Sequence, residues 1–211
     1  MRIDRLRGLY AVTPDEGDTA RLCAMTGAAI DGGATAVQYR NKTAADALRA
    51  EQALALARMC RQRGALFIVN DDPQLARDVD ADGVHIGEDD AAIAQARAGM
   101  KSDRIVGVSC YDDIARAHAA ARAGADYIAF GSFFPSQVKP GARRARPSLV
   151  GAAKSLGVPV VGIGGITSEN APVLVEAGID AVAVITDVFA HADPSAITRA
   201  AARIAACFES S

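Results

Sequence analysis

Short runs of apolar and β-branched residues recur along the whole chain. There are eight of them, and most are almost continuously apolar: Leu9–Thr13, Ala36–Arg40, Leu66–Asn70, Gly83–Gly87, Arg104–Ser109, Tyr127–Gly131, Val158–Gly164 and Ala181–Thr186. Runs of this length without polar alternation are typical of strands that helices cover on both faces. The pattern therefore predicts a parallel sheet.

The segments between these runs have the composition of helices. Ala44–Arg63, Ala91–Ala98 and Asp112–Ala123 are the clearest examples, and several segments are followed by a glycine, such as Gly64 or Gly124, where a helix commonly ends. Strand and helix thus alternate from end to end, which indicates an α/β fold.

A repeated pattern of small residue, polar residue and strand start favours a closed barrel. Its polar positions are Thr35, Asp82, Asp126 and Asp180, and they precede the second, fourth, sixth and eighth predicted strands. This spacing equals about one quarter of an eight-stranded barrel. We therefore predict one (β/α)8 TIM barrel domain over residues 1–211, and a doubly wound open sheet is the alternative.

Composition narrows the classes of partner. The chain has 23 Lys and Arg residues against 25 Asp and Glu residues, so no overall charge favours nucleic acid or a membrane surface. No apolar stretch approaches the ~20 residues of a membrane span, and the N-terminal apolar run is too short for a signal peptide. The four cysteines have no metal-binding spacing, which favours free thiols in a reducing compartment. A cytoplasmic protein is expected, and assembly into a homo-oligomer is left open.

The active site of such a barrel lies at the carboxyl ends of its strands. In the second strand Gln38, Arg40 and Lys42 share one face, while Val37 and Tyr39 share the other. The apolar pair should face the helices, and the polar trio should face the barrel mouth, where an anion would offset the cost of burying charge. The alternative is that Arg40 and Lys42 pair with internal carboxylates or reach solvent.

Carboxylates follow the third and fourth strands and indicate a Mg²⁺ site. Asp72 precedes Pro73 and is expected to cap a helix, and Asp89 resembles a cap as well. Asp71 and Asp90 are then the metal candidates, since Mg²⁺ commonly takes one or two carboxylates together with substrate phosphates. Helix capping remains the alternative for these two residues.

A second anion site is expected beside the seventh and eighth strands. Gly164 and Gly165 follow the seventh strand, where backbone N–H groups often bind phosphate, although the pair could serve only a tight turn. The long loop after the sixth strand holds Lys139 between prolines, and Arg143, Arg144 and Arg146 beyond it are expected at the solvated surface. Two phosphorylated small molecules are the predicted ligands.

The histidines form no catalytic triad. His118 and His191 are expected on helix surfaces, and His85, within the fourth strand, is interpreted as a hydrogen-bonded structural residue.

Six motifs, taken together, resemble the thiamine phosphate synthase family. They fall in order between Leu9 and Phe189 and each lies at an expected strand end: Val37–Lys42, Val69–Asp71, Gly83–Asp90, Gly107–Ser109, Phe134–Pro140 and Ile163–Ile166. The resemblance implies a transferase of thiamine biosynthesis that joins a pyrimidine diphosphate to a thiazole phosphate with Mg²⁺ and releases pyrophosphate.

The resemblance also assigns roles to individual residues. It implies that the pyrimidine diphosphate is bound by Gln38, Arg40, Lys42, Asn70, Ser109 and Lys139, with Asp71 and Asp90 holding Mg²⁺. It implies contacts with the thiazole phosphate from Ser136, Gln137, Val138, Gly165, Ile185 and Thr186. Tyr39 and Asn41 belong to the first motif and are included among the predicted substrate-binding residues.

The family's reaction is dissociative and needs no protein nucleophile, which agrees with the missing triad. Arg40, Lys42 and Lys139 are the predicted catalytic residues, because they would stabilise charge on the departing diphosphate. The sequence departs from the family where Asn41, Ser136–Val138 and Thr186 stand. A thiazole tautomerase-like relative and a non-catalytic phosphate-binding barrel are the competing interpretations.

Overall fold

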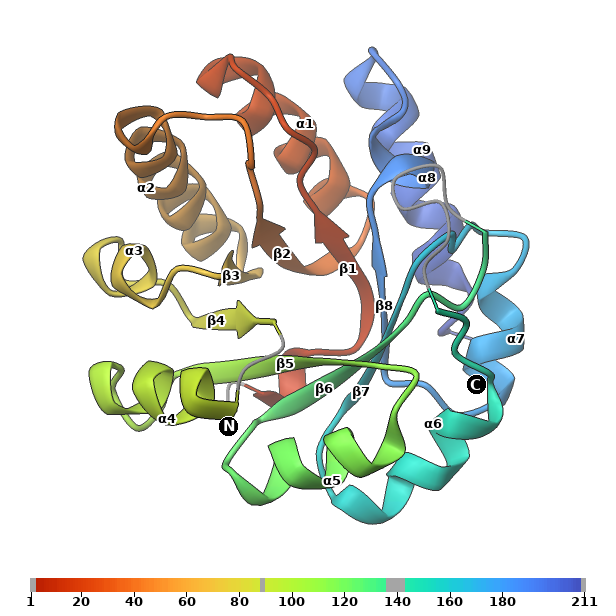
Figure 1. The fold of residues 1–211 in the computed structure, drawn as a ribbon. Helices are drawn as coiled ribbons and strands as arrows, with labels where there is room; N and C mark the ends of the chain where they lie inside the picture. Colours follow the sequence, from red (N-terminus) through yellow and green to blue (C-terminus); the bar gives the residue numbers. More distant parts are fainter. Residues whose placement is uncertain (1–2, 88–89, 136–142, 210–211) are drawn as a thin grey trace.

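In the computed structural model the chain forms a closed barrel of eight parallel strands with helices outside it (Figure 1). The structure describes residues 3–87, 90–135 and 143–209. Each strand pairs with its neighbour in the chain, and β1 also pairs with β8. The strands are β1 (Gly8–Val12), β2 (Ala34–Tyr39), β3 (Leu66–Asn70), β4 (Gly83–Ile86), β5 (Ile105–Tyr111), β6 (Tyr127–Gly131), β7 (Val160–Ile163) and β8 (Ala181–Val184). The predicted fold is confirmed.

The helices alternate with the strands and cover the outer face of the barrel (Figure 1). Aspartates cap several of them; Asp18 and Asp113, for example, accept hydrogen bonds from first-turn N–H groups. The helices are α1 (Thr19–Asp31), α2 (Asp46–Arg63), α3 (Pro73–Asp78), α4 (Asp90–Gly99), α5 (Ile114–Arg122), α6 (Ser148–Ala153), α7 (Ala171–Glu176), α8 (Thr186–Phe189) and α9 (Pro194–Ala206), with short 3₁₀ turns at Ile3–Arg5 and Lys154–Leu156.

Two apolar cores hold the layers together. The larger lies between strands and helices and includes Val37, Leu56 and Phe67. The smaller fills the barrel and includes Ile68 and Tyr127, with Leu6 packed among its members. This alternation of inward and outward side chains explains why both faces of each strand are apolar in the sequence.

Strand boundaries differ from the predictions by up to a few residues. β2 begins at Ala34, so Thr35 lies inside the strand instead of before it. β7 begins only at Val160, because Pro159 has no N–H to donate to a neighbouring strand. β8 ends at Val184, since Thr186 already belongs to the short helix α8.

The structure also bears on the cysteines and on membrane-spanning helices. The cysteines are free thiols. Within the described residues no helix is long and apolar enough to cross a membrane.

Candidate active site

A cavity of about 860 Å³ opens at the carboxyl end of the barrel, and the ends of all eight strands or their following loops contribute to it. Most of the predicted site residues that the structure describes line this cavity. They are Gln38, Arg40, Lys42, Asn70, Asp71, Ser109, Gly165, Ile185 and Thr186.

The β2 end supplies the cationic side of the cavity. The backbone of Arg40 is fixed on both sides by Thr13, whose hydroxyl accepts from the Arg40 N–H at 2.9 Å and donates to its carbonyl oxygen at 3.1 Å. The Arg40 guanidinium lies 3.8 Å from Asp15, which also accepts the backbone N–H of Lys42 at 2.9 Å. Part of the arginine's charge is thus compensated internally, while both cations remain at the cavity wall.

Tyr39 and Asn41, which the sequence analysis grouped with the substrate-binding residues, are not among the residues that line the cavity. The Tyr39 hydroxyl donates to Gln52 of α2 at 2.9 Å, and burial raises the pKa of Tyr39 to about 12. The amide of Asn41 donates to Gln52 and to the carbonyl oxygen of Glu16. Strand alternation turns Tyr39 toward the helices, and Asn41 instead supports the loop that carries Lys42.

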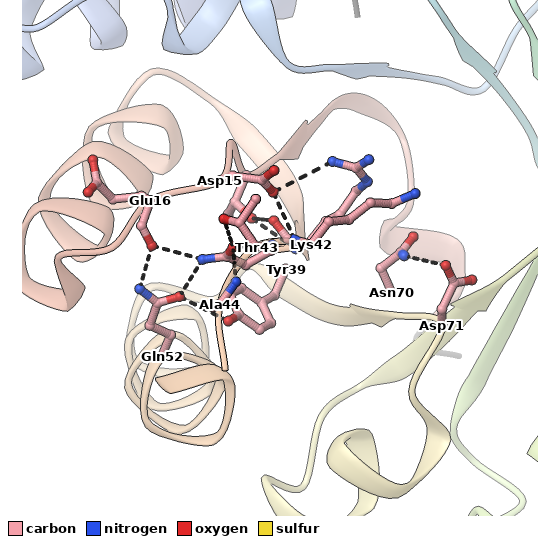
Figure 2. A network of polar contacts seen from close by, with 12 residues as sticks. Asp15, Glu16, Tyr39, Lys42, Thr43, Ala44, Gln52, Asn70 and Asp71 are labelled. Atoms are coloured by element: carbon pink, nitrogen blue, oxygen red, sulfur yellow. Dashed lines mark hydrogen bonds and ion pairs between the residues drawn. The ribbon is translucent and has the colours of Figure 1, made fainter. Parts of the chain in front are cut away.

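At the β3 end, Asn70 and Asp71 face the cavity as a hydrogen-bonded pair. The Asn70 amide donates to Asp71 at 2.7 Å (Figure 2), and Asp71 has a positive φ of 58°. The next residue, Asp72, accepts from the backbone N–H of Leu75 at 2.9 Å and also pairs with Arg49 at 2.8 Å. The predicted cap is therefore confirmed at Asp72, which leaves Asp71 as a carboxylate directed at the cavity.

The floor of the cavity is polar. His85 of β4 stacks on the Tyr127 ring and is hydrogen-bonded through both ring nitrogens, to the Tyr127 hydroxyl at 2.8 Å and the Ser109 hydroxyl at 2.9 Å. Burial lowers the pKa of His85 to about 4, so its imidazole is neutral near pH 7. The interpretation of His85 as a hydrogen-bonded histidine is confirmed.

The glycines that follow β7 contribute backbone groups to another part of the cavity wall. Gly165 has a φ of 63°, and a Cβ built there would lie 2.2 Å from the carbonyl oxygen of Pro135. The N–H of Phe134 donates to the carbonyl oxygen of Gly164 at 2.9 Å. The glycine pair therefore permits close packing against Phe134 and Pro135. A structural role in this turn is present whether or not a ligand binds there.

For five predicted site residues, either the whole residue or its side chain lies outside what the structure describes. Ser136, Gln137, Val138 and Lys139 fall outside the described residues. Asp90 is the first residue of α4, but its side chain is not described.

Several cavity residues were not predicted. His191 lines the cavity, contrary to its expected place on a helix surface, because it lies in the turn between α8 and α9. Arg143 reaches the rim while its side chain is 80 % exposed. Tyr10 lies at the floor, and the inward alternation of Tyr10 with Val12 along β1 was the signal that could have identified it.

A closed barrel with its polar and charged side chains gathered at the carboxyl ends of the strands defines a (β/α)8-barrel enzyme. The family model described as thiamine monophosphate synthase matches residues 9–188. The chain belongs to this family.

Similar proteins span nearly its whole length. It is 53 % identical over 198 residues to a protein of Chromobacterium violaceum named thiamine-phosphate synthase, covering 94 % of this chain and 96 % of that one. A protein of the same name from Methylobacillus flagellatus is 51 % identical, with 92 % and 93 % covered. Among solved structures, the thiamine phosphate pyrophosphorylase of Pyrococcus furiosus superposes with a TM-score of 0.85 at 32 % identity, covering 99 % and 98 %.

Proposed function

We propose that this chain is a thiamine-phosphate synthase: it condenses 4-amino-2-methyl-5-(diphosphooxymethyl)pyrimidine with 4-methyl-5-(2-phosphoethyl)thiazole to give thiamine phosphate and pyrophosphate. The observation that carries the proposal is a single cavity with Arg40 and Lys42 on one wall and the backbone of Gly165 and Thr186 on another. Two phosphorylated reactants can be held side by side in such a cavity.

The reaction needs no nucleophile from the protein, because the diphosphate leaves first and the thiazole nitrogen then attacks. The bond between the pyrimidine methylene carbon and the diphosphate oxygen breaks, and both electrons leave with the oxygen. The nitrogen lone pair of the thiazole then forms the new C–N bond. Arg40 and Lys42 stabilise the charge that develops on the departing diphosphate, and Lys139 is proposed to join them.

The substrate-binding roles follow the positions of the side chains. Gln38 and Ser109 lie at the floor and are assigned to the pyrimidine ring, and Asn70 is assigned to the diphosphate. Gly165, Ile185 and Thr186 are assigned to the thiazole phosphate, as are Ser136, Gln137 and Val138. Holding both rings in reacting orientation supplies the remaining catalytic advantage.

The residues at the β3 end suit Mg²⁺. Asp71 presents a carboxylate at the cavity wall beside the cationic side chains. Among the described residues no group of three His, Cys, Asp or Glu side chains gathers at one point. Mg²⁺ needs no such cluster, since one or two carboxylates and the substrate phosphates suffice. We assign Asp71 and Asp90 to the ion, which when bound would neutralise diphosphate charge.

The residues of the cavity wall favour a synthase over a thiazole tautomerase-like function. A barrel that only rearranges a thiazole phosphate has no use for Arg40, Lys42 and Asp71 at the opposite wall. The test is incubation of the protein with both precursors and Mg²⁺, followed by oxidation of thiamine phosphate to fluorescent thiochrome. Fluorescence must require both precursors. Its absence in the complete mixture would reject the proposed function.

A further inference from the structure

Five side chains form one continuous hydrogen-bonded chain across the inside of the barrel. The Gln38 amide nitrogen lies 2.9 Å from the Tyr10 hydroxyl, which lies 3.0 Å from the Tyr127 hydroxyl. Tyr127 continues to His85 at 2.8 Å, and His85 to Ser109 at 2.9 Å. Both ends of the chain, Gln38 and Ser109, line the cavity.

Counting the donors and acceptors in the chain favours one direction for every bond. The Gln38 amide nitrogen can only donate, so Tyr10 accepts from it and must direct its own proton to Tyr127. Tyr127 accepts that proton and directs its own to Nδ1 of His85. His85 then carries its proton on Nε2 and donates to Ser109.

The reverse order fails within the inner part of the barrel. If Nδ1 of His85 carried the proton, Tyr127 would donate to Tyr10, whose oxygen would accept from both neighbours. The Tyr10 proton would then have no acceptor among these residues, although only 1 % of Tyr10 is exposed. A buried unpaired hydroxyl proton is costly, so the first order is favoured.

This order decides what the two ends offer to a ligand. Gln38 donates one of its two amide N–H groups to Tyr10, and its amide oxygen has no partner within the chain, so this oxygen can accept from a ligand in the cavity. Ser109 uses its oxygen to accept from His85, which leaves its O–H free to donate. The floor thus presents an acceptor at the β2 side and a donor at the β5 side.

We propose that Tyr10, Tyr127 and His85 are positioning residues that hold Gln38 as an acceptor and Ser109 as a donor, and that they thereby select a 4-aminopyrimidine over its 4-oxo analogue. A 4-aminopyrimidine carries amine N–H donors and ring nitrogen acceptors. The 4-oxo analogue places a carbonyl oxygen where the amine stood and an N–H on the adjacent ring nitrogen. The carbonyl oxygen of the analogue would then face the Gln38 oxygen, which is also an acceptor, and its ring N–H would face the Ser109 O–H, which is also a donor. The selectivity rests on the proposed function, whereas the order of the bonds does not.

Nitrogen NMR of the wild-type protein tests the bond order without any substrate. The chain has three histidines, so a variant with His118→Gln and His191→Gln retains His85 alone and assigns its signals. The proposal predicts a neutral His85 with its proton on Nε2 and an unprotonated Nδ1. A proton on Nδ1 would overturn the order, whether or not the protein makes thiamine phosphate.

Kinetics with the amino and oxo pyrimidine diphosphates test the selectivity. We expect wild-type kcat/KM to favour the amino compound by about 100-fold or more, because a site built for one hydrogen-bonding pattern rejects the other strongly. Tyr127→Phe removes one hydroxyl and frees both ends to reorient, so this ratio should fall at least about tenfold, mainly through the amino compound.

Tyr39→Phe is the matched control, because it also removes one buried hydroxyl, bonded to Gln52 outside the cavity. Any loss it causes should fall equally on both compounds. An unchanged selectivity ratio in Tyr127→Phe would overturn the positioning role, since a purely structural defect lowers both values alike. A wild-type protein inactive with both compounds would reject the selectivity together with the proposed function, and the NMR result would still decide the bond order.

Discussion

The Asp126 carboxylate lies 2.7 Å from the backbone nitrogen of Val106, while the backbone N–H of Asp126 donates to the Val106 carbonyl oxygen at 2.8 Å. The same double contact joins Asp82 to Phe67 and Asp180 to Val160. Each aspartate thus accepts an N–H from the first or second residue of the preceding strand. The repeated aspartates of the sequence therefore stabilise the pairing of neighbouring strands, at the end of the barrel opposite the cavity.

Asp126→Ala should therefore destabilise the barrel without altering the chemistry. It leaves the Val106 N–H without its acceptor, and we expect a loss of about 1–3 kcal/mol in the free energy of unfolding. Urea unfolding measures this loss, and kcat per folded molecule should stay near the wild-type value. A fall in kcat at unchanged stability would show that the role of Asp126 reaches the active site.

Asp71→Asn should lower turnover by about 100-fold or more, because it removes the proposed carboxylate for Mg²⁺ while asparagine tolerates the same positive φ. Asp72→Asn is the matched control. Asparagine still caps α3, and only the partly exposed contact with Arg49 loses its charge, so we expect a change of less than about threefold. Steady-state rates over a Mg²⁺ titration compare the two. An essential Asp72 beside a dispensable Asp71 would contradict the assignment.

Asp90→Asn is predicted to resemble Asp71→Asn and to raise the Mg²⁺ concentration needed for half-maximal rate. The fold should survive, because Asp90 is the first residue of α4 and asparagine is well tolerated at the start of a helix. Thermal melting accompanies the Mg²⁺ titration. A wild-type Mg²⁺ requirement in this variant would remove Asp90 from the metal site.

Lys139→Ala should slow the chemical step more than it weakens binding of the thiazole phosphate, because charge on the leaving diphosphate grows in the transition state. Single-turnover rates and the thiazole phosphate dissociation constant separate the two effects. Unchanged single-turnover rates with weaker thiazole binding would move Lys139 to the other substrate.

Gly165→Ala should destabilise the protein whatever binds there. Its Cβ would lie 2.2 Å from the Pro135 carbonyl oxygen, at a φ of 63° that suits glycine, and we expect a cost of about 1–3 kcal/mol. Gly151→Ala is a control within α6, where an added Cβ meets nothing within 4 Å, and it should stabilise by about 0.5–1 kcal/mol.

Melting of both glycine variants, paired with titrations of each substrate, then tests the second anion site. A Michaelis constant raised for the thiazole phosphate alone, beyond what the melting loss explains, supports phosphate binding at Gly165. Equal weakening toward both substrates would leave Gly165 as a structural turn.

The sequence predicted the barrel well because burial and strand alternation are local properties. Gln38, Arg40 and Lys42 share a face of one strand, and that face meets the cavity. Asp72 was separated from Asp71 because Pro73 marks the start of a helix. Partners that are distant in the chain could not be predicted: the contacts of Asn41 with Glu16 and Gln52 leave no local signal in the sequence.

The polar floor was missed for the same reason. Tyr10 and Tyr127 are 117 residues apart, and each taken alone is an ordinary aromatic residue in an apolar strand. Only closure of the barrel brings their hydroxyl groups together with His85. Likewise, His191 reaches the cavity because α8 is short and turns the chain back toward the barrel mouth.

The most direct test of the whole account is a count of both products in one reaction. The wild-type protein, both precursors and Mg²⁺ are combined, pyrophosphate is followed by phosphorus NMR, and thiamine phosphate is measured as thiochrome in samples from the same tube. We expect one pyrophosphate for each thiamine phosphate. Pyrophosphate without thiamine phosphate in the complete mixture, or neither product, would contradict it.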